Sequence, residues 1–437
     1  MNRRNLLKSS AALLAGSAVT AALRTASAQE HSAAATRAPI PAPPGQDYTP
    51  VVTLNGSTLP WKMDGDVKVF HLIAEPVKRE FAPGMVVNCW GYNGQTPGPT
   101  IECVEGDRVR IYVTNRLREH TSIHWHGIFL PNGMDGVGGL TQPQIQPGET
   151  YVYEFTLGQN GTFMYHPHGD EMVQLAMGMM GMFIIHPKQP QAPRIDRDYA
   201  IMLHSFAVHA GTATPDPSVM VDFNMWTFNS RVFPGIDPLV ARLGERVRIR
   251  IGNLSMWNHP IHIHGVSFDV TGTDSGWIPP SARYKETTLL VPVGNVRVGE
   301  FVADVPGDWA LHCHFSHHTM NAMGHGVPNM LGVSQRGIAN RIRELVPGYM
   351  EMGEHGMAEH AEHMAMDHMA LPENTLPMMT GEGPFGLLEM GGMFTVLKIR
   401  ENLAAGDYRD PGWYQHPPGT VARLADAAEL RRLGLLA

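Results

Sequence analysis

The sequence predicts an all-β protein built from two β-sandwich domains in tandem. The chain contains an internal repeat, since residues 106–127 (GDRVRIYVTNRLREHTSIHWHG) superpose without a gap on residues 244–265 (GERVRIRIGNLSMWNHPIHIHG). In both copies apolar residues alternate with polar ones, which is the pattern of half-buried strands. Gly and Pro separate these short runs, and each copy spans about 130 to 150 residues, the size of a sandwich domain.

The repeat extends on both sides of this segment and sets the expected domain boundaries. Upstream, YNGQTPG at 92–98 is echoed by FNSRVFPG at 228–235, and downstream GTFMYHPHG at 161–169 is echoed by GDWALHCHF at 307–315. We therefore expect domain 1 at about 50–190 and domain 2 at about 196–400. The C-terminal tail, 401–437, ends in TVARLADAAELRRLGLL, which predicts a short helix with only a packing role.

The N-terminus predicts export. Residues 1–28 combine a basic start, a short apolar run and an Ala-Ser-Ala cleavage site, as in a signal peptide. Arg3 and Arg4 resemble a twin-arginine signal, and a chance pair in a general secretory leader is the alternative. Residues 29–49 are rich in Ala and Pro and predict a flexible linker. The mature protein is therefore expected to be periplasmic or secreted.

The charge balance argues against several classes of partner. The chain carries a formal net charge of -8, and removal of residues 1–28 takes away four basic residues and no acid, leaving -12. Such a chain is a poor partner for nucleic acid or an anionic membrane surface. No later stretch reaches about 18 apolar residues without charges, so no membrane span is expected.

Four His-x-His pairs are the strongest functional signal. Residues two apart on a strand point to the same face, so each pair presents two imidazoles on one side of its sheet. A lone buried histidine is more often part of a core than a ligand, but four pairs in registered repeats do not fit that interpretation. Imidazole binds copper, zinc, iron and nickel. The pairs are His124 and His126, His166 and His168, His262 and His264, and His312 and His314.

The stretch LHCHFSHHTMNAMGH at 311–325 favours copper among these metals. It brings together a thiolate, imidazoles and a thioether, which suit a blue copper centre of two His, one Cys and a weak axial Met. In the repeat alignment Cys313 stands opposite Pro167, and His259 stands opposite Thr121. The ligands of a single-copper site are therefore confined to the second copy, whereas the paired histidines occur in both.

These motifs resemble those of the multicopper oxidases. HWHG, HPHG, HPIHIHG and HCHFSHHTMNAM follow that family's order over about residues 50–330. The resemblance implies two cupredoxin-like Greek-key sandwiches and four coppers per chain, namely one type 1, one type 2 and two type 3. It assigns the type 1 copper to His259, Cys313, His318 and Met323, the type 2 copper to His124 and His262, and the type 3 pair to His126, His166, His168, His264, His312 and His314.

The same resemblance implies an oxidase of the laccase or cuprous oxidase type. One-electron oxidation of a small reducing substrate, which is cuprous ion, a phenol or another metal ion, would be coupled to four-electron reduction of O2 to water. Cys313 points to one face of its strand and His312 and His314 to the other, which gives an electron a short path between copper sites. Asp135 matches an acid that the family keeps near the cluster, where it would help to deliver protons.

Two alternatives stay open beside this interpretation. A copper-sequestering resistance protein would bind the metal without turnover. A copper nitrite reductase also has two domains and forms trimers, but it needs neither eight paired histidines nor a type 1 cysteine in domain 2.

The spacing departs from that of three-domain family members. His259 lies only 91 positions after His168, which leaves no room for a middle domain. The chain therefore resembles the two-domain, small laccase-like type, whose cluster takes histidines from adjacent subunits. A homotrimer is implied by this resemblance.

A long segment interrupts the pattern after the cysteine motif. Residues 390–398 (MGGMFTVLK) echo MMGMFII of domain 1, so about 335–385 is interpreted as an insertion. Met390 then rivals Met323 as axial ligand, although the spacing from His318 favours Met323. From 350 to 379, eight Met are interleaved with four His, which favours transient copper binding; a Met-rich helix over an apolar groove is the alternative.

The two other cysteines leave a further question open. Cys89 and Cys103 flank the turn-rich GYNGQTPGPT. In an oxidising compartment the sequence allows either a disulfide between them or two buried free thiols.

Overall fold

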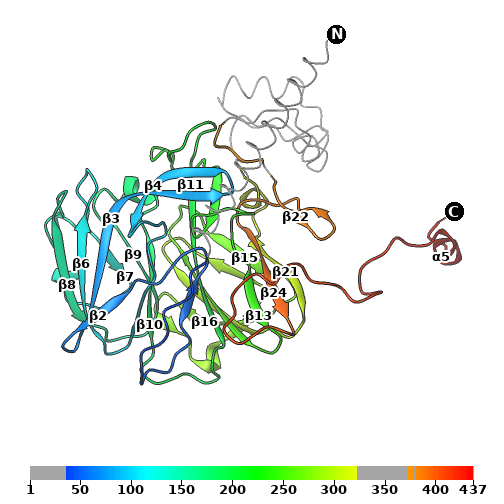
Figure 1. The fold of residues 1–437 in the computed structure, drawn as a ribbon, viewed down its shortest axis with the longest axis horizontal. Coiled ribbons are helices and arrows are strands. Elements are labelled where there is room, and N and C mark those ends of the chain that lie inside the picture. The colour runs from blue at the N-terminus through cyan, green and yellow to red at the C-terminus, as the bar shows by residue number, and fades with distance from the viewer. Residues whose placement is uncertain (1–35, 322–372, 378, 437) are drawn as a thin grey trace, which may run out of the picture.

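Two β-sandwiches make up the body of the protein in its computed structural model, which describes residues 36–321, 373–377 and 379–436 (Figure 1). The predicted export signal and Met323 lie outside the described residues. So does the Met/His-rich segment, apart from residues 373–377 and 379. None of the described helices is long and apolar enough to cross a membrane.

Domain 1 consists of two facing sheets. One has the strand order β2-β3-β6-β8 with β4 paired to β3, and the other has the order β5-β10-β9-β7. The helical turns η2 (Asn132–Met134) and α2 (Glu171–Ala176) lie in its loops. The strands are β2 (Trp61–Asp64), β3 (Val67–Ala82), β4 (Met85–Tyr92), β5 (Ile101–Val104), β6 (Arg108–Asn115), β7 (His124–His126), β8 (Thr150–Thr156), β9 (Gly161–His166) and β10 (Gly181–His186).

Domain 2 repeats this architecture with a larger first sheet. The larger sheet has the order β1-β11-β14-β20-β16-β17, with β12 on β11 and β18 on β16, and the smaller has the order β13-β24-β21-β15-β19. The first sheet contains β1 (Val51–Thr53), β11 (Arg197–Phe206), β12 (Met225–Phe228), β14 (Arg246–Asn253), β16 (Phe268–Thr273), β17 (Gly276–Trp277), β18 (Tyr284–Glu286) and β20 (Val296–Val302). The second contains β13 (Leu239–Arg242), β15 (His259–Ile263), β19 (Thr288–Val291), β21 (Gly307–Cys313) and β24 (Phe394–Arg400).

The all-β prediction is confirmed. Only short helical pieces accompany the strands in the described part of the chain, and domain 2 adds η3 (Pro280–Ala282), η4 (Ser316–Thr319) and the hairpin of β22 (Glu382–Gly383) and β23 (Gly386–Leu387). One connection was not expected, because β1 lies at the start of the range expected for domain 1 yet pairs with β11 in the sheet of domain 2. The chain therefore enters domain 1 from domain 2 and returns to it.

Strand β14 departs from the predicted alternation for a reason that lies at the domain interface. Its apolar residues are buried as expected, but Arg248 and Arg250 between them are buried as well. Arg250 makes two hydrogen bonds of 2.8 Å to Asp198 and donates a third, of 2.7 Å, to Thr162 Oγ1 in domain 1. A buried guanidinium is tolerated where its donors are paired in this way. The polar face of the strand is thus a contact between domains.

Three apolar cores hold the molecule together. One lies inside each sandwich, and the third lies between them. The third is rich in methionine, whose flexible side chain fills irregular gaps; its buried methionines are Met85, Met164, Met180, Met182, Met202 and Met225. The two domains therefore share a packed interface.

Cys89 and Cys103, for which the sequence allows either a disulfide or free thiols, are both buried free thiols. Cys103 belongs to the core of domain 1, whereas Cys89 belongs to the core between the domains. Because their side chains lie in different cores, the disulfide alternative is wrong.

Strand β24 closes domain 2 after the long interruption. It pairs antiparallel with β21, as β10 pairs with β9 in domain 1. Asn321, the last described residue before the gap, accepts from the N–H of Gly392 at 2.9 Å and donates to Pro377 O at 3.3 Å. The described chain on either side of residues 322–372 thus meets at Asn321, beside the start of β24.

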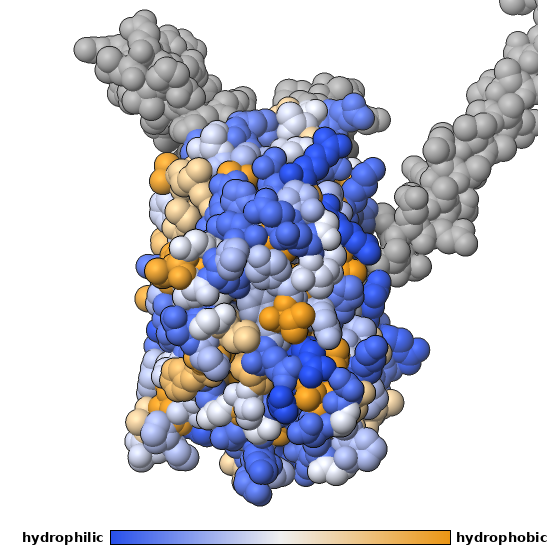
Figure 2. Space-filling view, turned by 90° about the vertical axis from the view of Figure 1, so that its left-hand side faces the viewer, coloured by the Kyte–Doolittle hydropathy of each residue, from blue (hydrophilic) through white to orange (hydrophobic). Residues whose placement is uncertain are grey.

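The tail helix is present as α5 (Ala427–Arg432), but the expectation that it packs on the body is wrong for the described residues. Residues 417–436, termed the C-terminal arm, run away from the sandwiches (Figure 1). Figure 2 shows the face of the sandwiches that lies on the left in Figure 1. This face is mainly hydrophilic, with scattered apolar residues.

Candidate metal centre

Two histidines and a cysteine form a buried cluster in domain 2. Strands β15 and β21 are neighbours, with Ile261 opposite Cys313, and η4 follows β21 directly. Cys313 Sγ lies 3.7 Å from Nδ1 of His259 and 3.3 Å from Nδ1 of His318. All three side chains are fully buried. The three residues that the sequence spreads over 60 positions thus present one sulfur and two nitrogens to a common point.

Burial sets the protonation of this cluster. It lowers the pKa of His259 to about 3 and that of His318 to about 2, so both imidazoles are neutral. It also raises the pKa of the Cys313 thiol to about 12. A neutral imidazole is the form that binds a metal, and a coordinating thiol gives up its proton to the cation. The donor set has two imidazoles, one thiol and no carboxylate, and it fits copper.

Ser255 orients one of these imidazoles. Its Oγ lies 2.7 Å from His259 Nε2 and 2.7 Å from Asn253 Oδ1. Because an amide oxygen only accepts, the hydroxyl donates to Asn253 and accepts from His259 Nε2–H. His259 is therefore held in the tautomer that directs an unprotonated Nδ1 at Cys313.

Aromatic rings cover the other imidazole. Trp226 is stacked on His318 with ring centroids 3.7 Å apart, and Trp257 and His317 contact the same ring edge-on. Within the described residues, His318 Nε2 and Trp226 Nε1 are buried without a hydrogen-bond partner. The imidazole is thus held by stacking and by the contact of its Nδ1 with Cys313 Sγ.

Domain 1 gathers its four paired histidines at one end of the sheet that contains β7 and β9. His124 lies directly opposite His166 in the strand register. His126 Nδ1 and His166 Nε2 face each other at 3.3 Å, and the His168 ring lies 5.7 Å from that of His124. Burial lowers the pKa of His166 to about 3, which keeps it neutral.

The four paired histidines of domain 2 lie in the same strand register as those of domain 1. His262 lies opposite His312, as the repeat requires. His264 Nε2 and His312 Nε2 are 3.1 Å apart, and the His314 ring lies 5.6 Å from that of His312. Cys313 points into the core of the domain, whereas its neighbours His312 and His314 are half-buried and exposed. The predicted separation of these side chains onto two faces of β21 is therefore present.

Backbone carbonyls fix the tautomers of several of these histidines. His124 Nδ1 donates to Asp135 O at 2.9 Å, and His262 Nδ1 donates to Thr287 O at 2.6 Å. The Nδ1 atoms of His166 and His312 likewise bond the carbonyls of the residues that follow them. In each case Nε2 is left to bind a metal, an arrangement typical of metal sites.

The two quartets do not meet within one chain. Among the described residues, every ring contact of a paired histidine joins it to a member of its own quartet. His264 and His314 are exposed, which is unusual for residues that would hold a metal cluster. In the described part of one chain the two quartets therefore stay separate, each on its own domain.

Asp135 lies where the sequence predicts an acid. Its Oδ1 is 3.5 Å from His124 Nδ1, and its backbone carbonyl accepts from the same nitrogen. The carboxylate is about one-third exposed, so it reaches both the histidine and solvent. This position suits an acid that exchanges protons with water beside the domain 1 quartet.

Met390, which the sequence offers as an alternative axial ligand to Met323, does not pack in the core that contains Cys313. Met390 packs in a small separate cluster with Phe233 and Phe394, away from the core that contains Cys313. Met393 instead belongs to the Cys313 core, and its carbonyl accepts from the N–H of Cys313 at 3.1 Å. Met390 is thus only partly buried, against a different cluster, which argues against it as the axial ligand.

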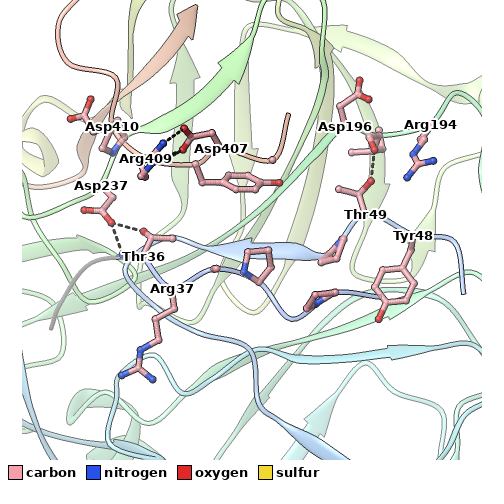
Figure 3. Close-up of a pocket in the computed structure, with 18 residues that line it drawn as sticks. Thr36, Arg37, Tyr48, Thr49, Arg194, Asp196, Asp237, Asp407, Arg409 and Asp410 are labelled. Carbon is pink, nitrogen blue, oxygen red and sulfur yellow. Dashed lines mark hydrogen bonds and ion pairs between the residues drawn. The ribbon is translucent and has the colours of Figure 1, made fainter. Parts of the chain in front are cut away.

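Two cavities differ in whether they reach these sites. One of about 510 Å³ joins the domain 1 quartet to Ser255 and is also lined by Met172, Met220 and Met256. The other, of about 1130 Å³, is lined by four separate segments, 36–50, 194–196, 237–238 and 406–410, and by none of the paired histidines (Figure 3). In it Thr36 bonds Asp237 and Arg409 pairs with Asp407, so part of its polar lining is already paired.

Sequence reasoning missed Ser255 and Trp226 as parts of the cluster. The repeat contains a signal for Ser255. This serine aligns with Leu117 of the first copy, as His259 aligns with Thr121, so both positions change from one copy to the other. In domain 1 Thr121 donates instead to Gln174. The serine and the histidine are thus paired changes that accompany the cysteine, whereas no sequence pattern points to Trp226.

Two family models described as multicopper oxidase match residues 74–190 and 210–330, which together make up more than half of the chain. Copper resistance protein A of Escherichia coli is 48% identical over 111 residues, which are 25% of this chain and 18% of that protein. The chain thus matches only a small part of this curated relative.

Solved structures extend the likeness to both domains. A multicopper oxidase named mgLAC is 32% identical, with a TM-score of 0.53 over 59% of this chain and 82% of that one. A blue copper oxidase from Nitrosomonas europaea has the same fold, with a TM-score of 0.55 and 24% identity over 76% of this chain and 85% of that chain. The matched models, the repeated sandwiches and the His-Cys-His cluster place this chain in the multicopper oxidase family, as a two-domain, laccase-like member with the cysteine site in domain 2.

Proposed function

We propose that the protein is an exported copper oxidase that couples one-electron oxidation of a reducing substrate to four-electron reduction of O2 to water. The observation that carries the proposal is the arrangement on β21. Cys313 faces His259 and His318 on one side, and His312 and His314 emerge on the other. Two metal sites joined through adjacent residues suit the passage of electrons from one to the other.

The proposal assigns a role to each group of side chains. His259, Cys313 and His318 hold the type 1 copper, with Met323 as axial ligand. His124 and His262 hold the type 2 copper, and the other six paired histidines hold the type 3 pair. Copper, when bound, supplies the one-electron redox chemistry that these side chains lack. Around it the chain fixes the imidazole tautomers, excludes water from Cys313 and places Asp135 as a proton donor.

A second copy of the chain completes the cluster in this proposal. Each chain offers one quartet from domain 1 and one from domain 2, and both are open half-sites. Docking domain 2 of one copy on domain 1 of the next would bring eight imidazoles together. Such head-to-tail contacts close into a ring, and a homotrimer is the form that we propose.

Cuprous ion is the leading substrate, and phenols or other metal ions are alternatives. The Met/His-rich segment supports this choice, since thioether and imidazole ligands suit copper. It would bind copper transiently on its way to the type 1 site. The basic, apolar leader supports export to the periplasm or beyond by the twin-arginine route.

The two alternative functions account for fewer of the observations. A copper-sequestering protein needs no ordered separation of Cys313 from His312 and His314. A copper nitrite reductase needs no eight paired histidines. Both alternatives predict copper binding, so the amount of copper alone does not separate them from an oxidase.

The test is a joint measurement of copper content, blue absorbance and O2 uptake on the copper-loaded protein. The proposal predicts about four coppers per chain, a blue band and one O2 consumed for every four electrons taken from the substrate. Copper binding without O2 uptake would indicate sequestration. Nitrite reduction without O2 uptake would indicate a nitrite reductase.

A further inference from the structure

The C-terminal arm, residues 417–436, has local structure of its own but no packing partner among the described residues. Up to residue 416 the tail is attached to its own body: Tyr414 N–H donates to Asp308 Oδ2 at 2.7 Å, and the His416 ring lies 5.8 Å from that of Phe385. Beyond this point, in the described chain, every hydrogen bond and ion pair of the arm joins two of its own residues. Figure 1 shows α5 standing apart from both sandwiches.

The arm has a defined local structure. Asp426 caps α5 by accepting from the N–H of Ala428 at 2.6 Å. Gly434, with φ of 68°, ends it in a Schellman motif, in which Leu435 N–H bonds Leu430 O at 2.9 Å. Both ends of α5 are therefore capped by residues of the arm itself. An isolated helix this short is nevertheless marginal in water, and most helix stability in proteins comes from packing.

The side chains that would supply such packing face solvent. Leu424 is 95% exposed and Leu435 is 72% exposed, and Leu433 and Leu436 are exposed as well. Isolated exposed leucines are common, but several on one short segment mark a contact surface. The arm thus carries an unpartnered apolar face.

We propose that the arm docks on a second copy of this chain. The inference rests on the proposed function, since the open histidine quartets already require copies to associate. The arm leaves domain 2, the domain that would cover the next copy's domain 1. In the loops that follow His126 in the chain, domain 1 exposes Phe129 and Leu140, at 72% and 81%, which gives the second copy apolar surface to offer.

The charge of the arm also favours a second copy of the chain as its docking partner. The arm contains three Arg and two acidic residues, whereas the chain as a whole has a formal net charge of -8. Docking on another copy therefore brings a slightly basic segment to an acidic body. Exchange of such arms around a ring would fasten each copy to the next without changing any copper ligand.

The test compares the mass of the copper-loaded protein on dilution, by light scattering or sedimentation, between the full chain and a chain ending at His416. The proposal predicts that the shortened oligomer dissociates at a protein concentration at least about tenfold higher. A variant with Leu424→Ser, Leu433→Ser and Leu435→Ser should reproduce the loss. The matched control, Ala422→Ser with Ala425→Ser, changes two exposed positions but keeps the leucines and the charges of the arm, and it should dissociate like the full chain.

The outcomes separate this inference from the proposed function. An unchanged oligomer mass with a lower melting temperature would mean that the arm folds back on its own chain and would overturn the inference. Binding of the full chain, but not the shortened one, to lipid vesicles with no change in mass would also overturn it. A full-length protein that is monomeric and takes up no O2 would instead overturn the proposed function.

Discussion

Ser255 Oγ lies 2.7 Å from Nε2 of His259 and holds this imidazole with Nδ1 toward Cys313. The serine itself is anchored by Asn253, whose side-chain amide also bonds the carbonyls of Trp257 and Val291. A chain of polar contacts thus runs from the loop after β14 to the cysteine cluster. The position of the imidazole depends on it.

Replacing Ser255 should therefore disturb the type 1 copper selectively. Ser255→Ala leaves His259 Nε2 buried without a partner, and loss of such a partner typically costs about 10- to 100-fold in metal affinity. We expect a shifted or weakened blue band and a changed reduction potential. Ser255→Thr keeps the hydroxyl and should retain most of the signal. If the alanine and threonine variants have the same spectrum, the hydroxyl has no such role.

The three buried cysteines provide a matched test of the metal ligand. Cys313→Ser should abolish the blue band and O2 uptake, because an alkoxide is a poor substitute for a thiolate on copper. Cys103→Ser, also at a fully buried position, should keep both signals and lose at most about 1–3 kcal/mol of stability for the buried hydroxyl. A blue band that persists in Cys313→Ser would contradict the assignment.

The axial position can be assigned by replacing three methionines in turn. Met323→Leu should change the reduction potential and spectrum of the type 1 copper, since a weak axial thioether tunes both. Met390→Leu should leave both unchanged, because Met390 packs with Phe233 and Phe394 outside the Cys313 core. Met393→Leu is the control for packing in that core. A spectral change only in Met390→Leu would contradict this expectation.

A buried carboxyl far from the copper sites predicts a pH effect on stability. Burial raises the pKa of Glu102 to about 8, and its Oε1 lies 2.7 Å from Nε2 of His186, whose pKa burial lowers. Above pH 6.5 the histidine is neutral in both states, whereas the unfolded carboxyl is ionised and the folded one keeps its proton. Stability contributed by Glu102 is therefore lost as the pH rises to 8.

The expected slope is up to about 1.4 kcal/mol per pH unit for this one group. Denaturant unfolding of the metal-free protein between pH 6.5 and 8 measures it. Glu102→Gln keeps an acceptor for His186 and Val51 N–H, and it should remove most of the slope. Equal slopes in the two proteins would show that Glu102 is ionised in the folded state.

Much of the arrangement of the paired histidines could be predicted from the sequence because these residues follow strand periodicity. His124 and His166, and likewise His262 and His312, are cross-strand partners in equivalent registers, as the repeat implies. Alternation alone places Cys313 on the face opposite to His312 and His314. Local rules therefore reach these residues without knowledge of the tertiary structure.

The features that the sequence did not predict depend on contacts between distant segments of the chain. Trp226 stacks on His318 from another sheet, 92 positions away, and no periodicity connects the two. The burial of Arg250 requires Asp198 and Thr162 from neighbouring strands. The helix of the arm was predictable from its own caps, but whether it packs is decided by a surface that the sequence does not reveal.

The most direct test of the proposed copper cluster between two copies uses two variants that are each expected to be inactive. The first carries His124→Ala and His166→Ala in domain 1, and the second carries His262→Ala and His312→Ala in domain 2. Each alone should have no O2 uptake. Co-expressed, they form contacts in which an intact domain 2 of the first meets an intact domain 1 of the second. A chain with all four substitutions, co-expressed with either variant, is the inactive control.

The account predicts that the mixed oligomers recover O2 uptake together with copper in the rebuilt clusters. Recovery requires that the two quartets come from different copies, since no chain in the mixture carries both intact. Mixed oligomers that bind copper at Cys313 and still consume no O2 would contradict it.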